Sequence, residues 1–131
     1  MPDYYDTATQ LNEYLVFHYG NDASVLNWDF GPVKALGFHE RLVGWVDKSR
    51  LRAKSRALDL GCAVGRITFE LTRVCESVVG VDYSATFIES AEKIRESGLV
   101  TFRLTREGDL GTAAQVHLSS DLVRDRVSFC Q

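Results

Sequence analysis

A short loop of small residues between two apolar runs constrains this chain more than any other feature. The run Ala57–Leu60 has the length of a strand, and Gly61–Gly65 follows it directly. Apolar residues then recur at helical spacing over 67–74, while Val78–Asp82 is β-branched and too short for a helix. Strand, loop, helix and strand in this order form a βαβ unit, which requires a parallel sheet. The predicted fold class is therefore α/β.

The glycine spacing of the loop separates two classes of cofactor. A dinucleotide fingerprint needs glycine at 61, 63 and 66, where the chain has Gly61, Ala63 and Arg66. The pattern acidic-x-G-x-G-x-G, typical of S-adenosylmethionine sites, matches better through Asp59, Gly61 and Gly65, with Ala63 as one small departure. Glycine allows unusual backbone angles and lets a ligand approach the main chain. S-adenosylmethionine is the predicted cofactor, and a nicotinamide-dependent oxidoreductase is the weaker alternative.

Asp82 ends the second strand, about 20 residues past the loop, where an acid accepts hydrogen bonds from ribose hydroxyls. Taken alone, Asp82 is equally well interpreted as a cap for the helix expected over Ser84–Ser97. Asp59 is expected either to sense the ammonium of the cofactor through water or to satisfy nearby loop amides. The full set of predicted cofactor-binding residues is Asp59, Gly61, Cys62, Ala63, Gly65, Asp82 and Tyr83.

The N-terminal third is predicted to be helical and partly aromatic. Apolar spacing predicts a helix over Thr7–Tyr19, capped by Asp6 or Thr7 and ended by Gly20. His18 falls on the apolar side of this helix. It is interpreted as a hydrogen-bonded core residue in preference to a substrate ligand. The segment Asn21–Pro32 is expected to be a loop that carries two buried aromatic side chains, Trp28 and Phe30.

A second helix is expected from Val33 or Phe38 to about Lys48. Its apolar side comprises Leu42, Val43, Trp45 and Val46. The basic run 48–56 is interpreted as a solvated linker in preference to a phosphate-binding patch. Near the other end of the chain, alternation predicts strands at 100–106 and 126–130, with a turn at 108–111 and weaker alternation over 115–118 between them.

Composition narrows the classes of partner. The net charge is −3 and the pI about 5.6, so no electrostatic footprint for nucleic acid is present. No apolar run is long enough to span a membrane, and the first residues lack a secretory signal, which predicts a soluble cytoplasmic protein. The three cysteines (Cys62, Cys75 and Cys130) form no C-x-x-C pair, and the histidines are scattered. Neither a disulfide framework nor a metal site is expected.

These residues resemble a class I S-adenosylmethionine-dependent methyltransferase. Four blocks extend the resemblance to the methyltransferase domain of ovothiol-synthesising enzymes, a 4-mercaptohistidine N1-methyltransferase (5-thiohistidine in the other ring numbering). They are Tyr4–Thr7, Glu13–Gly20, Phe30–Pro32 and Ala57–Arg66. The loop is specific to methyltransferases broadly, and the N-terminal tyrosine and histidine block points to the subfamily.

The resemblance implies that an imidazole nitrogen of a thiol-bearing histidine, a small-molecule substrate, attacks the methyl group of the sulfonium. The donor is already activated, so alignment matters more than a strong base, and no general base is nominated. Tyr4 and Tyr5 are candidates for a lid near the sulfonium, or for ordinary packing. Arg66 is a candidate contact to a carboxylate of cofactor or substrate, with a surface role as the alternative.

Set against the seven-stranded sheet of that family, the chain supplies strands 1 and 2, a hairpin insertion and strand 3. The sequence therefore resembles a domain truncated after strand 3, with a helical and aromatic lid segment at 1–55 and the first half of the Rossmann-like domain at 56–131. Strand 1 is then expected to be an open edge that invites self-association. The chain alone is expected to have weak activity, and a non-catalytic remnant that binds cofactor or a partner is the alternative.

Overall fold

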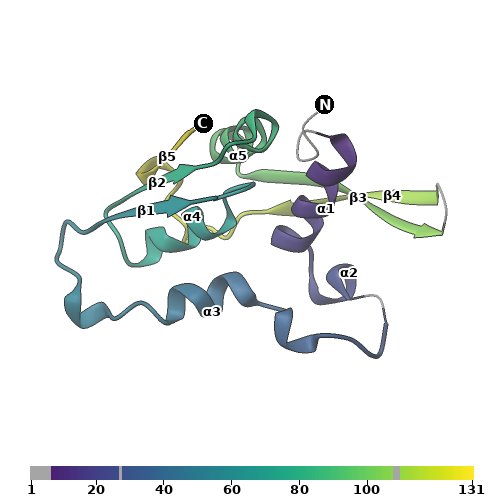
Figure 1. The fold of residues 1–131 in the computed structure, drawn as a ribbon, viewed down its shortest axis with the longest axis horizontal. Helices are drawn as coiled ribbons and strands as arrows, with labels where there is room; N and C mark the ends of the chain where they lie inside the picture. Colours follow the sequence, from purple (N-terminus) through teal and green to yellow (C-terminus); the bar gives the residue numbers. More distant parts are fainter. Residues whose placement is uncertain (1–6, 27, 108–109) are drawn as a thin grey trace.

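Three strands form a parallel sheet in which β2 lies between β1 and β5 (Figure 1). They are β1 (Arg56–Leu60), β2 (Ser77–Val81) and β5 (Val127–Cys130). The computed structural model describes residues 7–26, 28–107 and 110–131, with the backbone alone at 106 and 107. Leu58 pairs with Val79 in one direction, and Val79 pairs with Ser128 in the other. The predicted α/β class and parallel pairing are confirmed.

Two helical connections pack on one face of this sheet. They are α4 (Arg66–Glu70), continued by the 3-10 turn Leu71–Arg73, and α5 (Ala85–Ser97). A Cβ built on Gly80 of β2 would meet the Phe129 ring at 2.6 Å and the Thr68 hydroxyl of α4 at 2.8 Å. A Cβ built on Gly65 would meet the same ring at 2.6 Å and Ala91 of α5 at 3.3 Å. Both helices therefore cover the face that carries Gly80 and Phe129.

The opposite face of the sheet is exposed in the described structure. Leu58 and Leu60 of β1 are 61% and 73% exposed, and Val79 of β2 is also exposed. Among the described strands, β1 has β2 as its single neighbour, so its outer edge is unpaired. Parallel sheets are normally buried on both faces, which makes this apolar face unusual. The expected open edge at the first strand is therefore present.

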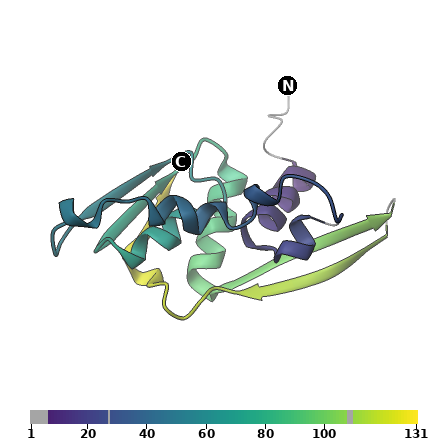
Figure 2. The same ribbon diagram turned by 90° about the horizontal axis from the view of Figure 1, so that it is seen from below.

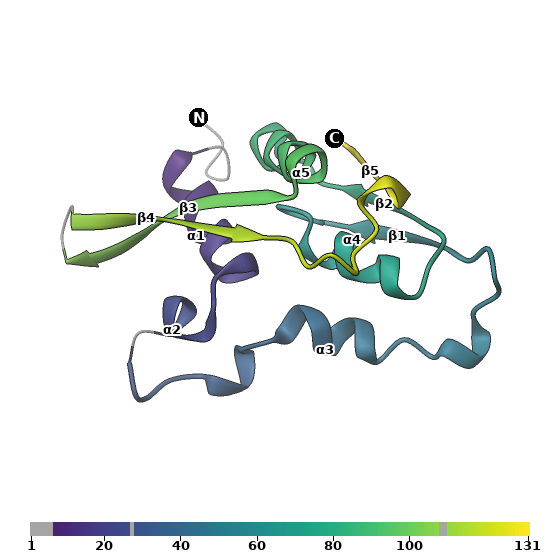
Figure 3. The same ribbon diagram turned by 180° about the vertical axis from the view of Figure 1, so that it is seen from behind.

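An antiparallel hairpin follows α5 and projects away from the sheet (Figure 3). Its strands are β3 (Leu99–Glu107) and β4 (Leu110–His117). Gly98 ends α5 in the left-handed conformation, with φ +70°, and β3 begins at the next residue. The predicted hairpin insertion is confirmed, although both strands are longer than expected. A 3-10 turn at Arg124–Arg126 then leads into β5.

Helix α1 (Ala8–Tyr19) lies between the hairpin and the sheet. Thr7 caps it by accepting a hydrogen bond from the Gln10 amide, and Gly20 follows its last residue, as predicted. The Asn12 amide donates to the Arg103 carbonyl at 2.8 Å and accepts from the Arg103 backbone N–H at 2.7 Å. Asn12 thus occupies the outer edge of β3. Leu15 and Tyr19 join the buried core.

Residues 21–55 form an arm that runs past α4 (Figures 1 and 2). Its elements are α2 (Asp22–Val25), α3 (Phe38–Gly44) and two 3-10 turns at Val33–Ala35 and Lys48–Arg50. Of its described residues, His39 and Val43 alone are buried. In the described part of the chain, every helix is too short or too polar to cross a lipid bilayer.

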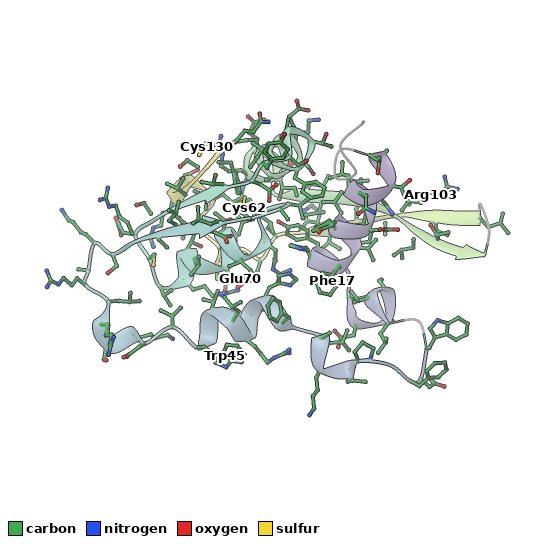
Figure 4. All side chains as sticks on the ribbon, viewed as in Figure 1. Phe17, Trp45, Cys62, Glu70, Arg103 and Cys130 are labelled. Atoms are coloured by element: carbon green, nitrogen blue, oxygen red, sulfur yellow. The ribbon has the colours of Figure 1, made fainter. Side chains whose placement is uncertain are left out.

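Three aromatic residues of the arm correct the sequence predictions. The rings of Trp28 and Phe30 stack with their centroids 6.2 Å apart. These two residues are 69% and 75% exposed, so the prediction that they are buried is wrong. Trp45 is 76% exposed and projects from the end of α3 (Figure 4), not onto its apolar side. Helix α3 ends at Gly44, and its short length leaves no continuous apolar face for these side chains to join.

Candidate functional site

The loop that joins β1 to α4 folds back in three left-handed residues. The φ angles are +74° at Gly61, +47° at Ala63 and +83° at Gly65. A Cβ built on Gly61 would meet no atom within 4 Å, whereas one on Gly65 would enter the Phe129 ring. Gly65 is thus required by packing as well as by its backbone angles. Gly61 presents an open stretch of main chain, which a ligand can approach closely.

Asp82 fastens this loop to the neighbouring strand and helix. Its Oδ2 accepts a hydrogen bond from the Ala63 backbone N–H at 2.8 Å, and its Oδ1 accepts from the Ser84 backbone N–H at 2.9 Å. The N-cap of α5 is Ser84, whose hydroxyl accepts from the Phe87 amide. Asp82 therefore orients the start of α5 and the loop together. It lies at the carboxyl edge of the sheet, where the sequence predicts a ribose contact.

Asp59 is held from below by α4. The buried Thr68 hydroxyl donates to Asp59 Oδ2 at 2.7 Å. Burial raises the pKa of the Asp59 carboxyl, the hydrogen bonds from Thr68 lower it, and the Asp82 charge raises it again. Two carboxylates thus face the same loop. Thr68 was missed by sequence reasoning, because a threonine inside a helical pattern carries no distinctive signal.

Cys62 fills the space beneath the loop. Its side chain is buried (Figure 4), and its Sγ lies 3.7 Å from the Ala63 carbonyl oxygen. Burial, with the charges of Asp59 and Asp82, raises the pKa of the Cys62 thiol to about 12. A neutral thiol is a poor nucleophile, so Cys62 shapes the loop and takes no part as a reactive group.

Tyr83 is 78% exposed and follows Asp82 directly at the same edge of the sheet. Its ring is therefore open to solvent, and its contact with a cofactor stays a prediction. Tyr4 and Tyr5, the predicted lid residues, lie outside the described residues, as does Asp6, one of the two predicted caps.

Arg66 makes contacts within the protein that differ from the surface role considered for it. Its guanidinium is mostly buried and pairs with Glu40 of α3 at 2.5 Å and with Glu70 of α4 at 2.9 Å. It also donates to the His18 carbonyl at 3.1 Å and lies over the Tyr19 ring. The Arg66 side chain is 18% exposed, so the surface alternative is wrong, and its contact with a ligand carboxylate stays a prediction. Within the protein it joins α1, α3 and α4.

The partner of Arg66 is a buried carboxylate that sequence reasoning missed. Glu70 is 1% exposed and pairs with both Arg66 and Arg73, the latter at 2.7 Å. Arg73 in turn pairs with Asp121, which precedes β5. Charge alternation on a helix usually indicates a solvated face, so no sequence signal predicts that Glu70 is buried.

His18 is half-buried and packs against His39, with their ring centroids 4.3 Å apart. Its Nδ1 is buried and has no hydrogen-bond partner among the described residues, so the predicted hydrogen-bonded role is wrong at that atom. Burial, the neighbouring imidazole and Arg66 lower the pKa of His18 to about 3. Burial and Arg66 lower the pKa of His39 to about 4. Both rings are neutral near pH 7.

A groove of about 990 Å³ lies away from this loop. It is bordered by α1, α2 and the hairpin, and Glu13, Phe17 and Trp28 are among its lining residues. Its described lining includes neither a residue of the β1–α4 loop nor Asp59 or Asp82, so the groove is not part of the candidate site. No group of three or more possible metal ligands occurs among the described residues.

The comparisons with known proteins agree with the geometry of the loop. A family model described as a methyltransferase domain matches residues 51–129, more than half of the chain. The match includes the loop, both carboxylates, the hairpin and nearly all of β5. A search of curated proteins finds no match.

Proposed function

The chain belongs to the methyltransferase domain family, whose members use S-adenosylmethionine, and we propose that it is an N-methyltransferase that acts on the imidazole of a thiol-bearing histidine. The observation that carries the cofactor half of this proposal is the juxtaposition of an open Gly61 backbone with the Asp82 carboxylate. The substrate half rests on the sequence resemblance to ovothiol-synthesising enzymes.

The residues at the loop fit the cofactor. A carboxylate offers about four acceptor sites, so Asp82 has capacity for two ribose hydroxyls beyond its bonds to Ala63 and Ser84. Asp59 supplies a negative charge for the ammonium of the methionine moiety. Tyr83 offers an exposed ring beside them. The loop backbone at Gly61 provides close approach without a side chain in the way.

S-adenosylmethionine, when bound, supplies a methyl group already activated by the adjacent sulfonium. The task left to the protein is alignment of the substrate nitrogen with that methyl group, which well-oriented sites perform efficiently. A neutral imidazole nitrogen has a free lone pair, so the proposal assigns no general base. The neutral Cys62 thiol and the paired Arg66 are consistent with a site that orients rather than reacts.

The N-terminal block that carries the subfamily resemblance is anchored to the loop. The Tyr19 hydroxyl donates to the Val64 carbonyl oxygen at 2.7 Å, and the Tyr14 ring lies 4.6 Å from that of Phe87 at the start of α5. Helix α1 therefore contacts both the loop and the start of α5. This placement supports a role for residues 13–20 in shaping the substrate side of the site.

Calorimetric titration with S-adenosylhomocysteine, with NADH as the control, tests the cofactor assignment. We expect the chain to bind S-adenosylhomocysteine and not NADH. Asp82→Ala should weaken the binding of S-adenosylhomocysteine about tenfold or more, because a charged hydrogen-bond partner is lost. Asp121→Ala, which removes an exposed carboxylate distant from the loop, is the matched control and should bind normally. NADH binding, or unchanged affinity in Asp82→Ala, would contradict the assignment.

Methyl transfer from labelled S-adenosylmethionine to thiol-bearing histidine, compared with histidine itself, tests the substrate. Transfer to the thiol-bearing form alone is the expected result. Binding of cofactor without transfer to either would favour the alternative, a non-catalytic cofactor-binding chain. We also propose that residues 1–55 serve as a lid segment for the Rossmann-like unit of residues 56–131.

A further inference from the structure

Asp59 and Thr68 form a buried contact that the proposed function does not yet use. Thr68 lies on α4 and is fully buried, and its hydroxyl donates to Asp59 Oδ2 at 2.7 Å. Asp59 lies on β1, one residue before the loop's flanking Leu60 and two before Gly61. The contact therefore joins α4 to the carboxylate that precedes the loop on β1.

Strand β2 makes room for this hydroxyl. Gly80 of β2 is paired with Asp59 in register, and a Cβ on Gly80 would come within 2.8 Å of Thr68 Oγ1. Gly80 is extended, so no backbone angle demands glycine there. The space is taken instead by the Thr68 side chain and the Phe129 ring. A glycine, a threonine and an aspartate from three elements thus fit together at one point.

We infer that Thr68 is a positioning residue that fixes the Asp59 carboxylate beneath the loop so that it receives the ammonium group of the cofactor. This inference rests on the proposed function, because it needs that ligand at the loop. A carboxylate with one oxygen tied to a rigid helix loses little freedom when it binds a cation. Its remaining acceptor sites stay available.

The electrostatics of the site agree with this role. The groups that face Asp59 are the Asp82 carboxylate at the end of β2, the Cys62 thiol of the loop and Thr68 of α4. Burial and Asp82 both raise the pKa of Asp59, and Thr68 opposes them. Since Cys62 stays neutral, Thr68 is the group here that favours the charged carboxylate. Without its hydroxyl, Asp59 would titrate at a higher pH.

The first test is S-adenosylhomocysteine binding to Thr68→Val, which keeps the shape of the side chain and removes its donor. We expect affinity to fall about tenfold, as for a hydrogen bond to a charged group. Thr68→Ser, which keeps the hydroxyl, should stay within about twofold of the parent. Thr72→Val is the matched control, because the buried Thr72 hydroxyl donates to the Phe69 carbonyl, away from Asp59. It should lower stability and leave affinity unchanged.

A double-mutant cycle separates positioning from general damage. In an Asp59→Asn background, Thr68→Val should cause no further loss of affinity, since both changes remove the same contribution. Additive losses, or an unchanged affinity in folded Thr68→Val, would overturn the inference. If the valine variant does not fold, Thr68→Cys replaces the hydroxyl with a weak donor of similar size and takes its place.

Carbon NMR titration of the Asp59 carboxyl in the ligand-free protein gives a readout independent of binding. Its pKa should rise in Thr68→Val and stay near the parent value in Thr68→Ser and Thr72→Val. An unchanged pKa would overturn the inference. Failure of the parent chain to bind S-adenosylhomocysteine would instead contradict the proposed function, and the NMR result would still show whether Thr68 holds Asp59.

Discussion

The sheet with its glycine loop and the arm of residues 21–55 are held in place by different means. Around the loop, backbone amides, buried side chains and carboxylates meet at fixed points, with Val64 and Phe69 fully buried. In the arm, His39 and Val43 alone are buried among the described residues, and Arg66 is its main polar tie. Burial in this chain is therefore concentrated in the half that carries the candidate site, and the arm has few buried side chains to fix its position.

Replacing one glycine of each region by alanine should show this difference most clearly. Gly65→Ala forces an L-residue into a left-handed conformation and drives its Cβ into the Phe129 ring, so unfolding free energy should fall by about 4 kcal/mol. Gly44→Ala, in the arm, meets open space and should raise stability by about 0.5 kcal/mol. Chemical denaturation measures both. Equal effects at the two positions would contradict the contrast.

Replacing Arg66, which joins the arm to α4 through Glu40 and Glu70, should have the second largest effect on the free energy of unfolding. Arg66→Met leaves the buried Glu70 carboxylate with Arg73 as its remaining partner, and we expect a loss of about 3 kcal/mol. Glu40→Gln removes the exposed partner and should cost less than about 1 kcal/mol. Hydrogen exchange over α3 should accelerate strongly in Arg66→Met and weakly in Glu40→Gln. Unchanged exchange in Arg66→Met would show that the arm is held elsewhere.

The dependence of stability on pH tests the same contact region through His18 and His39, which pack on one another near Arg66. The pKa of His18 is about 3 and that of His39 about 4, below the ordinary value of 6.5. Below pH 6.5 the unfolded chain therefore binds more protons, and stability should decline as pH falls towards these values. Each imidazole contributes a slope of at most about 1.4 kcal/mol per pH unit. His39→Phe should flatten the slope, and an unchanged slope would contradict the assignment.

The exposed sheet face should affect folding stability least. We propose that copies of the chain associate through the unpaired β1 edge and the apolar face beside it, where Leu58 and Leu60 are exposed. Leu60→Lys should shift sedimentation towards the monomer and change unfolding free energy by less than about 0.5 kcal/mol. Trp45→Ser, which removes an exposed aromatic residue of the arm, should leave association unchanged. Equal effects would place the contact elsewhere.

The order of helices and strands could be predicted from the sequence wherever local sequence patterns and tertiary packing favour the same structure. Gly98 ends α5 and Gly61 opens the loop because each needs a left-handed backbone, and that need is visible in the sequence. Trp28, Phe30 and Trp45 were misplaced because hydrophobicity alone does not say whether a short segment has anything to pack against. Thr68 was missed because its partner, Asp59, lies on another element, and Glu70 was missed because charge spacing along a helix does not show that the carboxylate is buried. Within the candidate site, the glycines and carboxylates were predictable and their supports were not.

The contact between Asn12 and Arg103 sets an order of events during synthesis. The helix α1 leaves the ribosome long before the β3 backbone that Asn12 pairs with, and before Phe87, which Tyr14 contacts. The parallel sheet likewise waits for β5, since Val127 pairs with Val78. Contacts of such long sequence separation form slowly. We therefore expect α1 to lack its tertiary partners in the nascent chain until β3 emerges, a period in which a chaperone has access to Leu11 and Leu15.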